Sequence, residues 1–567
     1  MQKKRWVFLD ENLSENEINS AAQRLSVSPV IIKLLYNRGI TDDHEITSFI
    51  QKALSSVHNP LLLPDMDKAA DRIVKAIEDG EKICIYGDYD VDGITSCAVL
   101  YKYLLSHGAD VSYYIPDRIS EGYGVNIKAI NKISKSGCKL LITVDCGITA
   151  VGETELAKAQ GMDVIITDHH TCKDKIPDAL AVINPKRPDS TYPFEQLAGV
   201  GVAFKTVLAL SMRFGEDTKE IFYKYSPYAA IGTVADVVSL TDENRIIVHR
   251  GIQEICKNAS AGIDALMDVA GIKELSASSV AFGLAPRINA AGRMGSPELA
   301  AELLLCESKA SAKEIAMKLN EENQRRRVCE QDIYHEAESF IKKHKDMLSA
   351  PVLVIYGEGW HQGVVGIVAS RLCEMFYKPV ILISHENGIG HGSCRSIEGF
   401  NIFDALTYCQ DLLEKFGGHA MAAGVSLKMT EIDKFVAKIN EYGRKHITPD
   451  MTMPTMNIDC TIPPGALTEA NIHTLSLLEP FGEGNPMPVF AIQGAKVGAA
   501  MPIGEDGVHL RLQLIKDGYT MSCIAFRMGE LYDKLSAGTM IDIAFTPEIN
   551  CYNNRRSVQL RITDIKL

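Results

Sequence analysis

Hydrophobic positions in the first half of the chain follow two alternating patterns. Residues 66–79 and 94–106 carry apolar side chains at helical spacing, whereas 83–87, 140–144 and 163–167 are short continuous apolar runs. Short apolar runs between amphipathic helices are typical of buried strands in a parallel sheet. The pattern therefore predicts an α/β domain with a largely parallel sheet.

The pattern changes in the second half of the chain. Residues 308–347 have few helix-breaking residues and many charges, which predicts a long exposed helix that connects two domains. Strands are predicted at 352–356 and 380–383, with a helix at 363–376 between them and a glycine-rich turn at 388–393. These elements indicate a second, smaller α/β domain.

The C-terminal part of the chain contains short strand patterns, separated by turn signals, and almost no long helical pattern. A small β-barrel accounts for this arrangement. The predicted organisation is a helical N-terminal segment at 1–65, a first α/β domain at 66–255, a helical region with the connector at 256–350, a second α/β domain at 351–430 and the barrel at 455–567.

Size and composition fit a globular protein of several domains. The 567 residues are too many for one core, and 46% hydrophobic with 23% charged residues is ordinary for such proteins. No apolar run is long enough for a signal peptide or a membrane span, so we expect no membrane association and a cytoplasmic location. The 14 cysteines include no Cys-x-x-Cys pair, which argues against structural zinc and against a disulfide framework.

The net charge of −13 argues against a protein that coats nucleic acid by bulk attraction. A local basic groove is nevertheless compatible with this charge. Two short basic clusters, Arg325-Arg326-Arg327 and Arg555-Arg556 with Arg561 nearby, are candidate phosphate contacts. Each cluster is equally compatible with an ordinary solvated face.

Acidic residues follow three predicted strands of the first α/β domain. The groups are Asp88, Asp90 and Asp92 after 83–87, Asp145 after 140–144, and Asp168, His169 and His170 after 163–167. Because ligands bind at the carboxyl ends of parallel strands, these side chains are expected to converge on one crevice. So many like charges would repel one another unless a cation lay among them, which predicts a divalent metal site.

Each of these residues also has an ordinary structural explanation. Asp145 or Asp168 alone could be a helix N-cap, and a single histidine could be a hydrogen-bonded structural residue. Asp236 interrupts an apolar helical stretch, where it could ligate a metal, cap a helix, or pair with Arg245 or Arg250. The triple carboxylate at 88–92 is the hardest to explain in this way, so the metal site is the favoured interpretation.

The donor types indicate the metal and its chemistry. Oxygen ligands with one or two imidazoles favour Mn²⁺ or Mg²⁺ over Zn²⁺, and the carboxylates are numerous enough for two ions. Two neighbouring ions suit the in-line hydrolysis of a phosphoester. The absence of a Walker loop argues against a nucleotide-driven motor.

The chain resembles the DHH phosphoesterases, which are named after the triplet that stands here as Asp168-His169-His170. Within this family it looks like the exonucleases specific for single-stranded DNA. The resemblance spans nearly the whole chain through the ordered motifs GDYDVDG (87–93), EGYG (121–124), VDCG (144–147), TVADVV (233–238), RINAAGR (287–293), GGH (417–419) and EPFGEGNP (479–486). It implies a DHH catalytic domain, a DHHA1-type substrate-binding domain and a C-terminal OB-fold that binds nucleic acid.

The resemblance implies roles for the acidic cluster. The positions that match the family's metal ligands are Asp90, Asp92, Asp145, His169 and Asp236. Asp145 would bridge the ions, and His170 would contact the scissile phosphate. Asp88 would ligate a metal or hold the motif loop. Some relatives have a metal-binding histidine where this chain has Tyr86, so one ion would bind loosely or use Asp88 or water.

The resemblance also implies a pocket for a 5′ phosphate. The residues assigned to substrate binding are Arg118, Arg287, Asn289, Arg293, Ser393, Arg395 and His419. Residues 390–396 would offer backbone amides, a hydroxyl and a guanidinium around a tight turn. A purely structural turn with surface arginines is the alternative.

In the implied OB-fold, bases would stack on aromatic side chains and phosphates would meet arginines. The candidates are Arg511, Phe526, Arg527, Tyr552, Arg555 and Arg556. Taken alone, each of them is better explained as a surface or core residue than as a contact. A channel between the α/β domains too narrow for a duplex would select single strands.

The combined hypothesis is a metal-dependent exonuclease that hydrolyses single-stranded DNA from 5′ to 3′ into mononucleotides, in DNA repair and recombination. Its candidate partners are a helicase and a single-strand-binding protein. One alternative is a DHH phosphodiesterase that acts on short oligonucleotides or cyclic dinucleotides, and another is a noncatalytic DNA-binding scaffold. The connector and barrel favour longer strands, and the intact acidic set argues against the scaffold.

Overall fold

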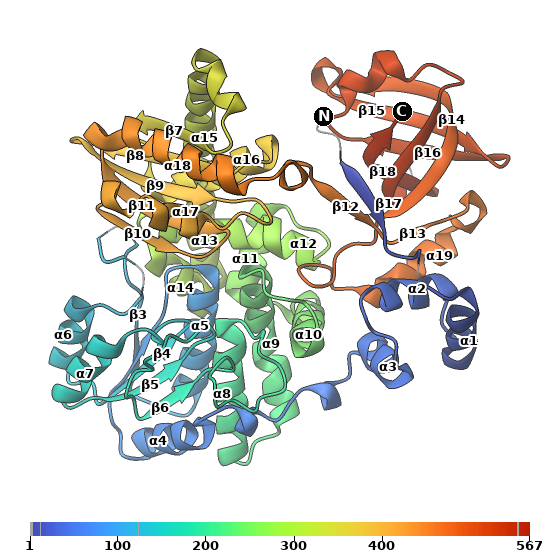
Figure 1. The fold of residues 1–567 in the computed structure, drawn as a ribbon. Helices are drawn as coiled ribbons and strands as arrows, with labels where there is room; N and C mark the ends of the chain where they lie inside the picture. Colours follow the sequence, from blue (N-terminus) through green and yellow to red (C-terminus); the bar gives the residue numbers. More distant parts are fainter. Residues whose placement is uncertain (1–3, 12, 119, 123, 553–554) are drawn as a thin grey trace.

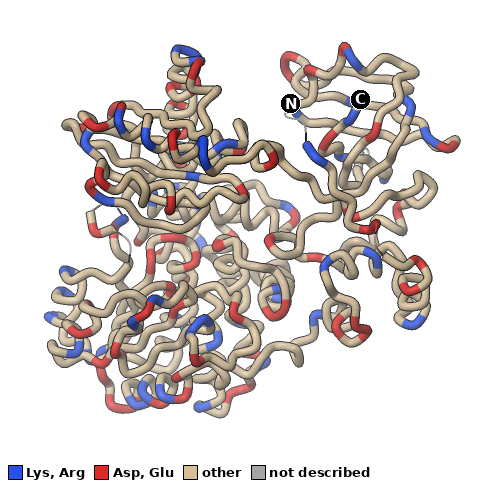
Figure 2. Tube along the Cα trace, viewed as in Figure 1, with Lys and Arg blue, Asp and Glu red and all other residues tan. Residues whose placement is uncertain are grey.

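The computed structural model describes residues 4–11, 13–118, 120–122, 124–552 and 555–567. Figure 1 shows the two α/β domains stacked on one side of the molecule and the barrel on the other, with the N-terminal helices below the barrel. Acidic and basic residues are interspersed along the trace (Figure 2). The predicted fold class is confirmed: two α/β domains joined by a long helix, followed by a β-barrel.

The first α/β domain is built on a five-stranded, fully parallel sheet. Its strands in spatial order are β3 (Val111–Tyr114), β2 (Ile83–Tyr86), β4 (Leu140–Val144), β5 (Asp163–Thr167) and β6 (Ala181–Ile183). The three predicted strands are the central ones, whose side chains are almost all buried. The sequence pattern does not reveal β3 and β6, because β3 is half-buried throughout and β6 has three residues.

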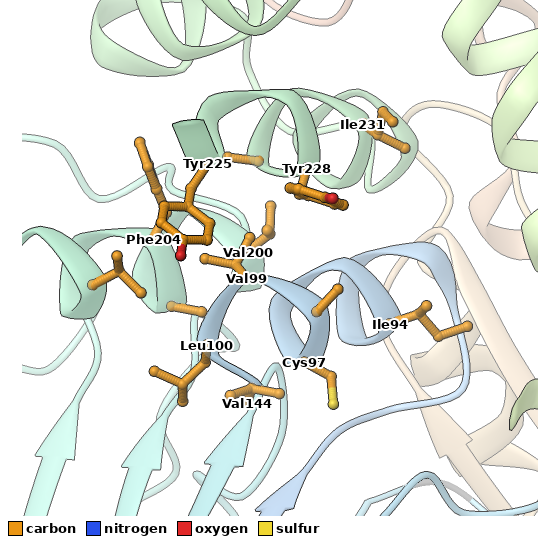
Figure 3. Packing of buried hydrophobic residues seen from close by; sticks show 14 of the residues in the cluster. Ile94, Cys97, Val99, Leu100, Val144, Val200, Phe204, Tyr225, Tyr228 and Ile231 are labelled. Atoms are coloured by element: carbon orange, nitrogen blue, oxygen red, sulfur yellow. The ribbon is translucent and has the colours of Figure 1, made fainter. Parts of the chain in front are cut away.

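The helices of this domain pack around a central helix, α5. They are α4 (Met66–Glu78), α5 (Val91–Ser106), α6 (Ile127–Lys135), α7 (Val151–Ala159), α8 (Gly199–Arg213), α9 (Thr218–Ala235) and α10 (Asp242–Asn258). Helix α5 is apolar around most of its circumference because it packs against both α8 and α9. Figure 3 shows Val99 and Leu100 of α5 in one apolar cluster with Val144, Phe204 and Tyr225. This packing brings the first turns of α5 and α8 together.

A helical region follows and leads into the connector. It contains α11 (Ala261–Ala270), α12 (Ala277–Ser279), the π-helix η3 (Val280–Leu284), α13 (Ala285–Met294), α14 (Pro297–Leu305) and α15 (Lys309–Lys343). Helix α15 has 35 residues and is therefore about 50 Å long. Its C-terminal half enters the core of the second domain through Ile333, Ala337 and Ile341. Among the described residues, no helix is both long and apolar enough to cross a membrane.

The second α/β domain contains a mixed five-stranded sheet. Its order is β10 (Lys415–Gly418), β11 (Ala422–Lys428), β9 (Ile389–Arg395), β8 (Val380–Glu386) and β7 (Leu353–Glu358). The helices that pack with it are α16 (Gln362–Phe376), α17 (Ile402–Tyr408) and α18 (Ile432–His446). Because α18 belongs to this core, the domain extends beyond the predicted end at residue 430.

The predicted turn at 388–393 is wrong for most of its length. Only Asn387 and Gly388, both at positive φ, form the turn between β8 and β9. Residues 389–395 form β9, which pairs with β8 on one side and β11 on the other. A Cβ at Gly390 or Gly392 would lie 2.8 or 2.9 Å from the Ile383 side chain. These glycines therefore permit close packing within the sheet, and the paired backbone amides of β9 are not available as an anion-binding turn.

The C-terminal domain is the predicted small β-barrel. Its ring consists of β14 (Phe490–Ile503), β15 (His509–Lys516), β16 (Tyr519–Ala525), β18 (Arg555–Lys566) and β17 (Met540–Tyr552), with β17 pairing back onto β14. Strand β13 (Cys460–Thr461) also pairs with β14, and helix α19 (Glu469–Thr474) precedes the ring. In β15, Leu510, Leu512 and Leu514 are buried and the residues between them are exposed, which is the alternation expected of such a strand.

The N-terminal segment packs on the barrel rather than on the domain that it precedes. It was expected to be helical throughout, but it begins with β1 (Arg5–Phe8), which pairs in parallel with β12 (Thr455–Ile458). Helices α1 (Glu15–Leu25), α2 (Pro29–Asn37) and α3 (Asp43–Gln51) follow. Ile18, Ile31 and Leu35 of these helices share one apolar core with Leu512 and Phe545 of the barrel.

Arg245 of α10 fastens the first α/β domain to the segment that precedes the barrel. Arg245 is 1% exposed, and its guanidinium donates hydrogen bonds to the carbonyl oxygens of Leu478 (2.6 Å) and Leu477 (2.9 Å). It also stacks on the ring of Phe49, 3.7 Å from the ring centre. Burial, and then the charge of Arg38, lowers the pKa of Arg245 to about 9. Three segments that are far apart in the sequence thus meet at one side chain.

We expect Arg245→Met to lower the free energy of unfolding by about 2–4 kcal/mol, because two buried hydrogen bonds from a charged donor would be lost, although Lys52 and Asn485 still donate to the same carbonyl oxygens. Chemical denaturation of the variant measures this loss. Arg213→Met is the matched control, since the partly exposed ion pairs of Arg213 with Asp67 and Asp71 are worth about 1 kcal/mol or less. Equal destabilisation of the two variants would contradict the role of Arg245.

Candidate metal centre

The carboxyl ends of the central strands in the first sheet bring the predicted ligands together. Asp88, Asp90 and Asp92 lie between β2 and the first turn of α5, Asp145 follows β4, and His169 follows β5. Because β2, β4 and β5 are neighbours in the sheet, these strand ends are adjacent. The crevice at this edge is therefore lined by acidic groups and an imidazole.

His169 is the centre of one group of ligand atoms. Its Nε2 atom lies 3.2 Å from Asp145 Oδ1, 3.6 Å from Asp236 Oδ2 and 3.9 Å from Asp92 Oδ2. Asp236 reaches this group from the residue directly after α9. Three carboxylate oxygens and one imidazole nitrogen, from four different segments of the chain, thus surround a space between them.

Asp88, Asp90 and Asp145 form a second group, whose ligand atoms lie within 4.8 Å of one another. Asp145 belongs to this group and also to the group around His169. Two overlapping groups that share one carboxylate are the arrangement expected for two ions with a bridging ligand.

Several buried polar atoms of these groups have no hydrogen-bond partner among the described residues. They are Asp88 Oδ1, Asp145 Oδ1 and both ring nitrogens of His169. Unpaired polar atoms in the interior are costly, and a cation would satisfy them. A set of carboxylate oxygens with one imidazole suits Mn²⁺ or Mg²⁺. The residues present therefore fit the predicted metal ions.

Backbone groups hold two of the carboxylates in place. Asp90 caps the N-terminus of α5 by accepting a hydrogen bond of 3.0 Å from Gly93 N. Both oxygens of Asp92 accept bonds of 2.7 Å, from the backbone N–H groups of Gly199 and Val200 in the first turn of α8. The positive ends of two helices thus offset part of the negative charge.

Asp145 lies in a tightly constrained position. Its φ is 58°, a left-handed conformation that is strained for a residue other than glycine and is enriched at functional sites. A Cβ at Gly199 would lie 2.4 Å from Asp145 Oδ1, so only glycine allows α8 to approach this closely.

Asp168, the first residue of the DHH triplet, orients the histidines that follow it. Its carboxylate accepts hydrogen bonds from the backbone N–H groups of Ile148 (2.9 Å) and His169 (2.7 Å), and lies 2.7 Å from His170 Nδ1. Hydrophobic and polar spacing does not reveal this role. The signal that would indicate it is an acid directly before two histidines, and the structure shows that this acid is buried.

The alternative explanations for single acids do not hold. Helix α7 begins after Ala150 and α8 after Ala198, so neither Asp145 nor Asp168 is a helix N-cap. Arg245 binds backbone carbonyls, and Arg250 binds Lys52 O and Gln253. Neither arginine is therefore the partner of Asp236.

Burial and mutual repulsion favour protonated carboxyls in this cluster. Burial, and then the charge of Asp90, raises the pKa of Asp88 to about 8 and that of Asp236 to about 7. Burial and neighbouring carboxylates also raise the pKa of Asp92 and of Asp145. A bound cation would reverse these shifts.

The two histidines have opposite tendencies. Burial, and then the charge of His170, lowers the pKa of His169 to about 3, which keeps its ring neutral, as a metal ligand requires. Burial also acts against protonation of His170, but the hydrogen bond and charge of Asp168 outweigh it and raise the pKa of His170. The side chain of His170 is more exposed than that of His169.

Three arginines from separate parts of the chain lie near one another, and two of them, Arg118 and Arg293, lie near the acidic groups. Arg118 precedes α6, and its guanidinium lies 5.1 Å from the centre of the Tyr89 ring. Burial, and then the charges of Arg118 and Arg326, lowers the pKa of Arg293 to about 10. Burial lowers the pKa of Arg395 as well, with a further contribution from Arg118. We call Arg118, Arg293 and Arg395 the arginine cluster.

Three predicted substrate-binding residues of the second domain lie on β9 or near its end. Arg395 Nη1 donates a hydrogen bond of 2.9 Å to Ser393 Oγ, so both side chains are on the same face of β9. His419 is exposed in the turn between β10 and β11, close to Arg395, since Ala422 pairs with Arg395.

Arg287 and Asn289 have structural contacts. Arg287 donates to Asn320 Oδ1 (3.0 Å) and to Gly283 O (2.7 Å), which ties α13 to α15 and η3; its role in substrate binding stays a prediction. Asn289 Oδ1 accepts a bond of 3.3 Å from Val91 N at the start of α5, and Asn289 also lines the cavity described next.

A cavity of about 1120 Å³ begins beside Asp236 and extends to the barrel. Its lining includes Val237, Phe282, Asn289 and Arg293 on one side and Phe526 and Arg561 of the barrel on the other. Phe282, in the π-helix η3, is 82% exposed. Arg561 lies over the Phe526 ring, 5.5 Å from its centre.

The other barrel candidates lie elsewhere. Arg511 and Arg527 are exposed, and Arg556 pairs with Glu469 at 2.8 Å. The side chains of Tyr552 and Arg555 lie outside what the structure describes.

Comparison with known proteins identifies all three domains. Residues 82–233 match the DHH family N-terminal domain, residues 349–445 the DHHA1 domain and residues 458–564 the RecJ OB domain. The chain is 38% identical to the single-stranded-DNA-specific exonuclease RecJ of Bacillus subtilis, over 99% of this chain and 71% of that protein.

The structure is also similar to crystal structures of RecJ from Thermus thermophilus. The complex with Mn²⁺ has a TM-score of 0.84 at 30% identity, covering 99% of this chain and 79% of that chain. The complex with Mg²⁺ has a TM-score of 0.79 at 29% identity, covering 99% and 78%. By sequence and by fold, the chain belongs to the RecJ family of the DHH phosphoesterases.

Proposed function

We propose that this chain hydrolyses single-stranded DNA from the 5′ end into mononucleotides, in DNA repair and recombination. Its membership of the RecJ family supports the general activity, that of a metal-dependent exonuclease specific for single-stranded DNA. The observation that supports the catalytic assignment is the crowding of buried carboxylates and an imidazole whose ligand atoms lack partners among the described residues. The 5′ polarity is supported by the arginine cluster beside them.

Two overlapping sets of residues would hold the ions. The first set is Asp92, Asp145, His169 and Asp236, and the second is Asp88, Asp90 and Asp145. Two bound ions would activate water and offset charge on the attacking and leaving oxygens of the phosphodiester. Tyr86 takes no part in either set, because its hydroxyl binds Gly124 O at 2.9 Å and Asn126.

His170 and Asp168 act as a pair next to the proposed ions. The hydrogen bond that His170 Nδ1 donates to Asp168 favours the protonated form of the His170 ring and fixes its orientation. A protonated His170 would contact a non-bridging oxygen of the scissile phosphate and stabilise the charge that develops there. Asp168 acts through His170 and is a positioning residue.

A terminal phosphate fits the arginine cluster. Like charges brought together in a partly buried position favour an anion between them, and guanidinium groups bind phosphate through paired hydrogen bonds. Ser393 would add a hydroxyl. Because Arg118 rests on Tyr89, between Asp88 and Asp90, a phosphate held there would place the first nucleotide beside the proposed ions.

The cavity offers a path for the rest of the strand. Phe282 on one wall, and Phe526 with Arg561 on the other, supply rings for base stacking and a charge for backbone phosphates. Stacking accepts every base, so this path needs no sequence recognition.

We further infer the setting in which the enzyme works. An enzyme that digests single strands needs a supply of them, and a helicase with a single-strand-binding protein would provide it. The cytoplasm is the proposed location, because all the cysteines are free thiols and most are buried.

Substitution of Asp145 tests the metal assignment. We expect Asp145→Ala to reduce hydrolysis by about 1,000-fold or more, because both sets lose their shared carboxylate, while the affinity for single-stranded DNA stays within about threefold. Asp178→Ala, which removes a fully exposed acid of the same domain, is the control and should keep full activity. Retained hydrolysis in Asp145→Ala would overturn the metal assignment.

Metal binding should be linked to pH. The folded-state pKa values of Asp88 (about 8) and Asp236 (about 7) are raised, so metal-free protein holds extra protons and loses stability as the pH rises from about 4 to 8. Metal ions require the deprotonated carboxylates. The increase in Tm on adding Mn²⁺ to EDTA-treated protein should therefore be larger at pH 8 than at pH 6. An equal increase at both pH values would contradict the link.

Polarity is tested with strands labelled at either end, with and without a 5′ phosphate, in Mn²⁺ or Mg²⁺. We expect the 5′ label to be released first, as a mononucleotide, and strands with a 5′ phosphate to be preferred. Arg118→Met should reduce that preference about tenfold, because a charged phosphate contact is lost. Arg213→Met is the control on the outer surface. Earlier release of the 3′ label would refute the proposed direction.

A further inference from the structure

Two stacked tyrosines stand at the base of the loop that carries Arg118. Tyr86 and Tyr114 are the last residues of the neighbouring strands β2 and β3, and they lie directly opposite each other in the sheet. Their ring centres are 5.4 Å apart with 19° between the ring planes. Both hydroxyls bind groups in the loop between β3 and α6.

Tyr86 holds the end of this loop. Its hydroxyl donates a hydrogen bond of 2.9 Å to Gly124 O and accepts one of 3.2 Å from Asn126 Nδ2. Asn126 also caps α6, because its Oδ1 accepts a bond of 2.8 Å from Ala129 N. Gly124 has a φ of 83°, a left-handed turn that glycine adopts without strain. The end of the loop is therefore fixed to both β2 and α6.

Tyr114 holds the middle of the loop. Its hydroxyl donates a bond of 2.7 Å to Glu121 Oε1, and the other oxygen of Glu121 accepts a bond of 2.9 Å from Asp117 N. These contacts close the segment on both sides of Arg118. They leave the guanidinium over the Tyr89 ring, facing the acidic groups and the rest of the arginine cluster.

The hydroxyls of these tyrosines are not required by the packing of the core. Tyr86 is 0% exposed and belongs to an apolar cluster against which Tyr114 packs. A phenylalanine ring would fill the same space and would not need a buried partner for a hydroxyl. Both hydroxyls bind the loop, so their contribution is to hold it.

We propose that Tyr86 and Tyr114 are positioning residues that set the preference of the enzyme for a 5′-phosphorylated end, by fixing the loop so that Arg118 meets the terminal phosphate. This inference rests on the proposed function of Arg118 in the phosphate pocket. A loop without these bonds has to be ordered each time the phosphate binds, and that cost weakens binding. The metal-binding groups keep their own contacts, so the chemical step is unaffected.

Tyr86→Phe and Tyr114→Phe test this proposal, because each removes one oxygen and keeps the ring. Steady-state rates are measured on strands that differ only in carrying a 5′ phosphate or a 5′ hydroxyl. We expect the KM for the 5′-phosphorylated strand to rise about five- to tenfold in each variant, with kcat within about twofold. The KM for the 5′-hydroxyl strand should not change, a split that general damage to the fold would not produce.

Tyr103→Phe is the matched control, since Tyr103 of α5 is equally buried and donates its hydroxyl to Glu216 at 2.5 Å. It should behave as the wild type. An unchanged KM for the phosphorylated strand in both loop variants would overturn the proposal.

The variant Arg118→Met shows whether an unchanged KM in both tyrosine variants contradicts the positioning role alone or the proposed phosphate pocket as well. If Arg118→Met loses the phosphate preference while both tyrosine variants keep it, the positioning role is wrong and the pocket stands. If Arg118→Met keeps the preference, the pocket itself is wrong, and the positioning role is overturned with it.

Discussion

Repulsion among buried carboxylates at one edge of the first sheet is the constraint on which the rest of the structure depends. Five acids and the triplet at 168–170 share a space in which burial raises the pKa of four of the carboxyl groups. The first turns of α5 and α8 point backbone N–H groups at Asp90 and Asp92, and the core around α5 holds those turns in place. The apolar interior thus holds the carboxylates close together, and a cation would neutralise the negative charge that the backbone N–H groups leave.

The parts of this arrangement that follow from local pattern could be predicted from the sequence. The central strands are short apolar runs buried on both faces, and the position of Asp88, Asp145 and His169 at their ends follows from the parallel order of the sheet. Asp236 could be identified because an acid inside an apolar stretch needs a partner.

The parts that depend on distant contacts could not be predicted. The glycines at 390 and 392 have the composition of a turn, but neighbouring strands make them part of a sheet, because Ile383 leaves no room for a Cβ. Arg287 matches a family motif, but the motif does not show that its guanidinium donates to Asn320 Oδ1 of α15. The arginine cluster joins residues from three separate parts of the chain, so no spacing in the sequence encodes it, and only the family resemblance indicated Arg118, Arg293 and Arg395 as members of one pocket.

Because the N-terminal segment packs on the barrel, the domains of the chain form a closed ring. The first domain, α15, α16 and the barrel all contribute to the lining of the cavity, and the N-terminal helices lead from the barrel back to the first domain. A polymer that passes through such a ring of domains is enclosed by the protein on all sides. It would leave by sliding to an end, because sideways escape would require the N-terminal segment to separate from the barrel at both the β1–β12 pair and the shared apolar core. Retention of a threaded strand would then be a property of chain topology rather than of the strength of any one contact.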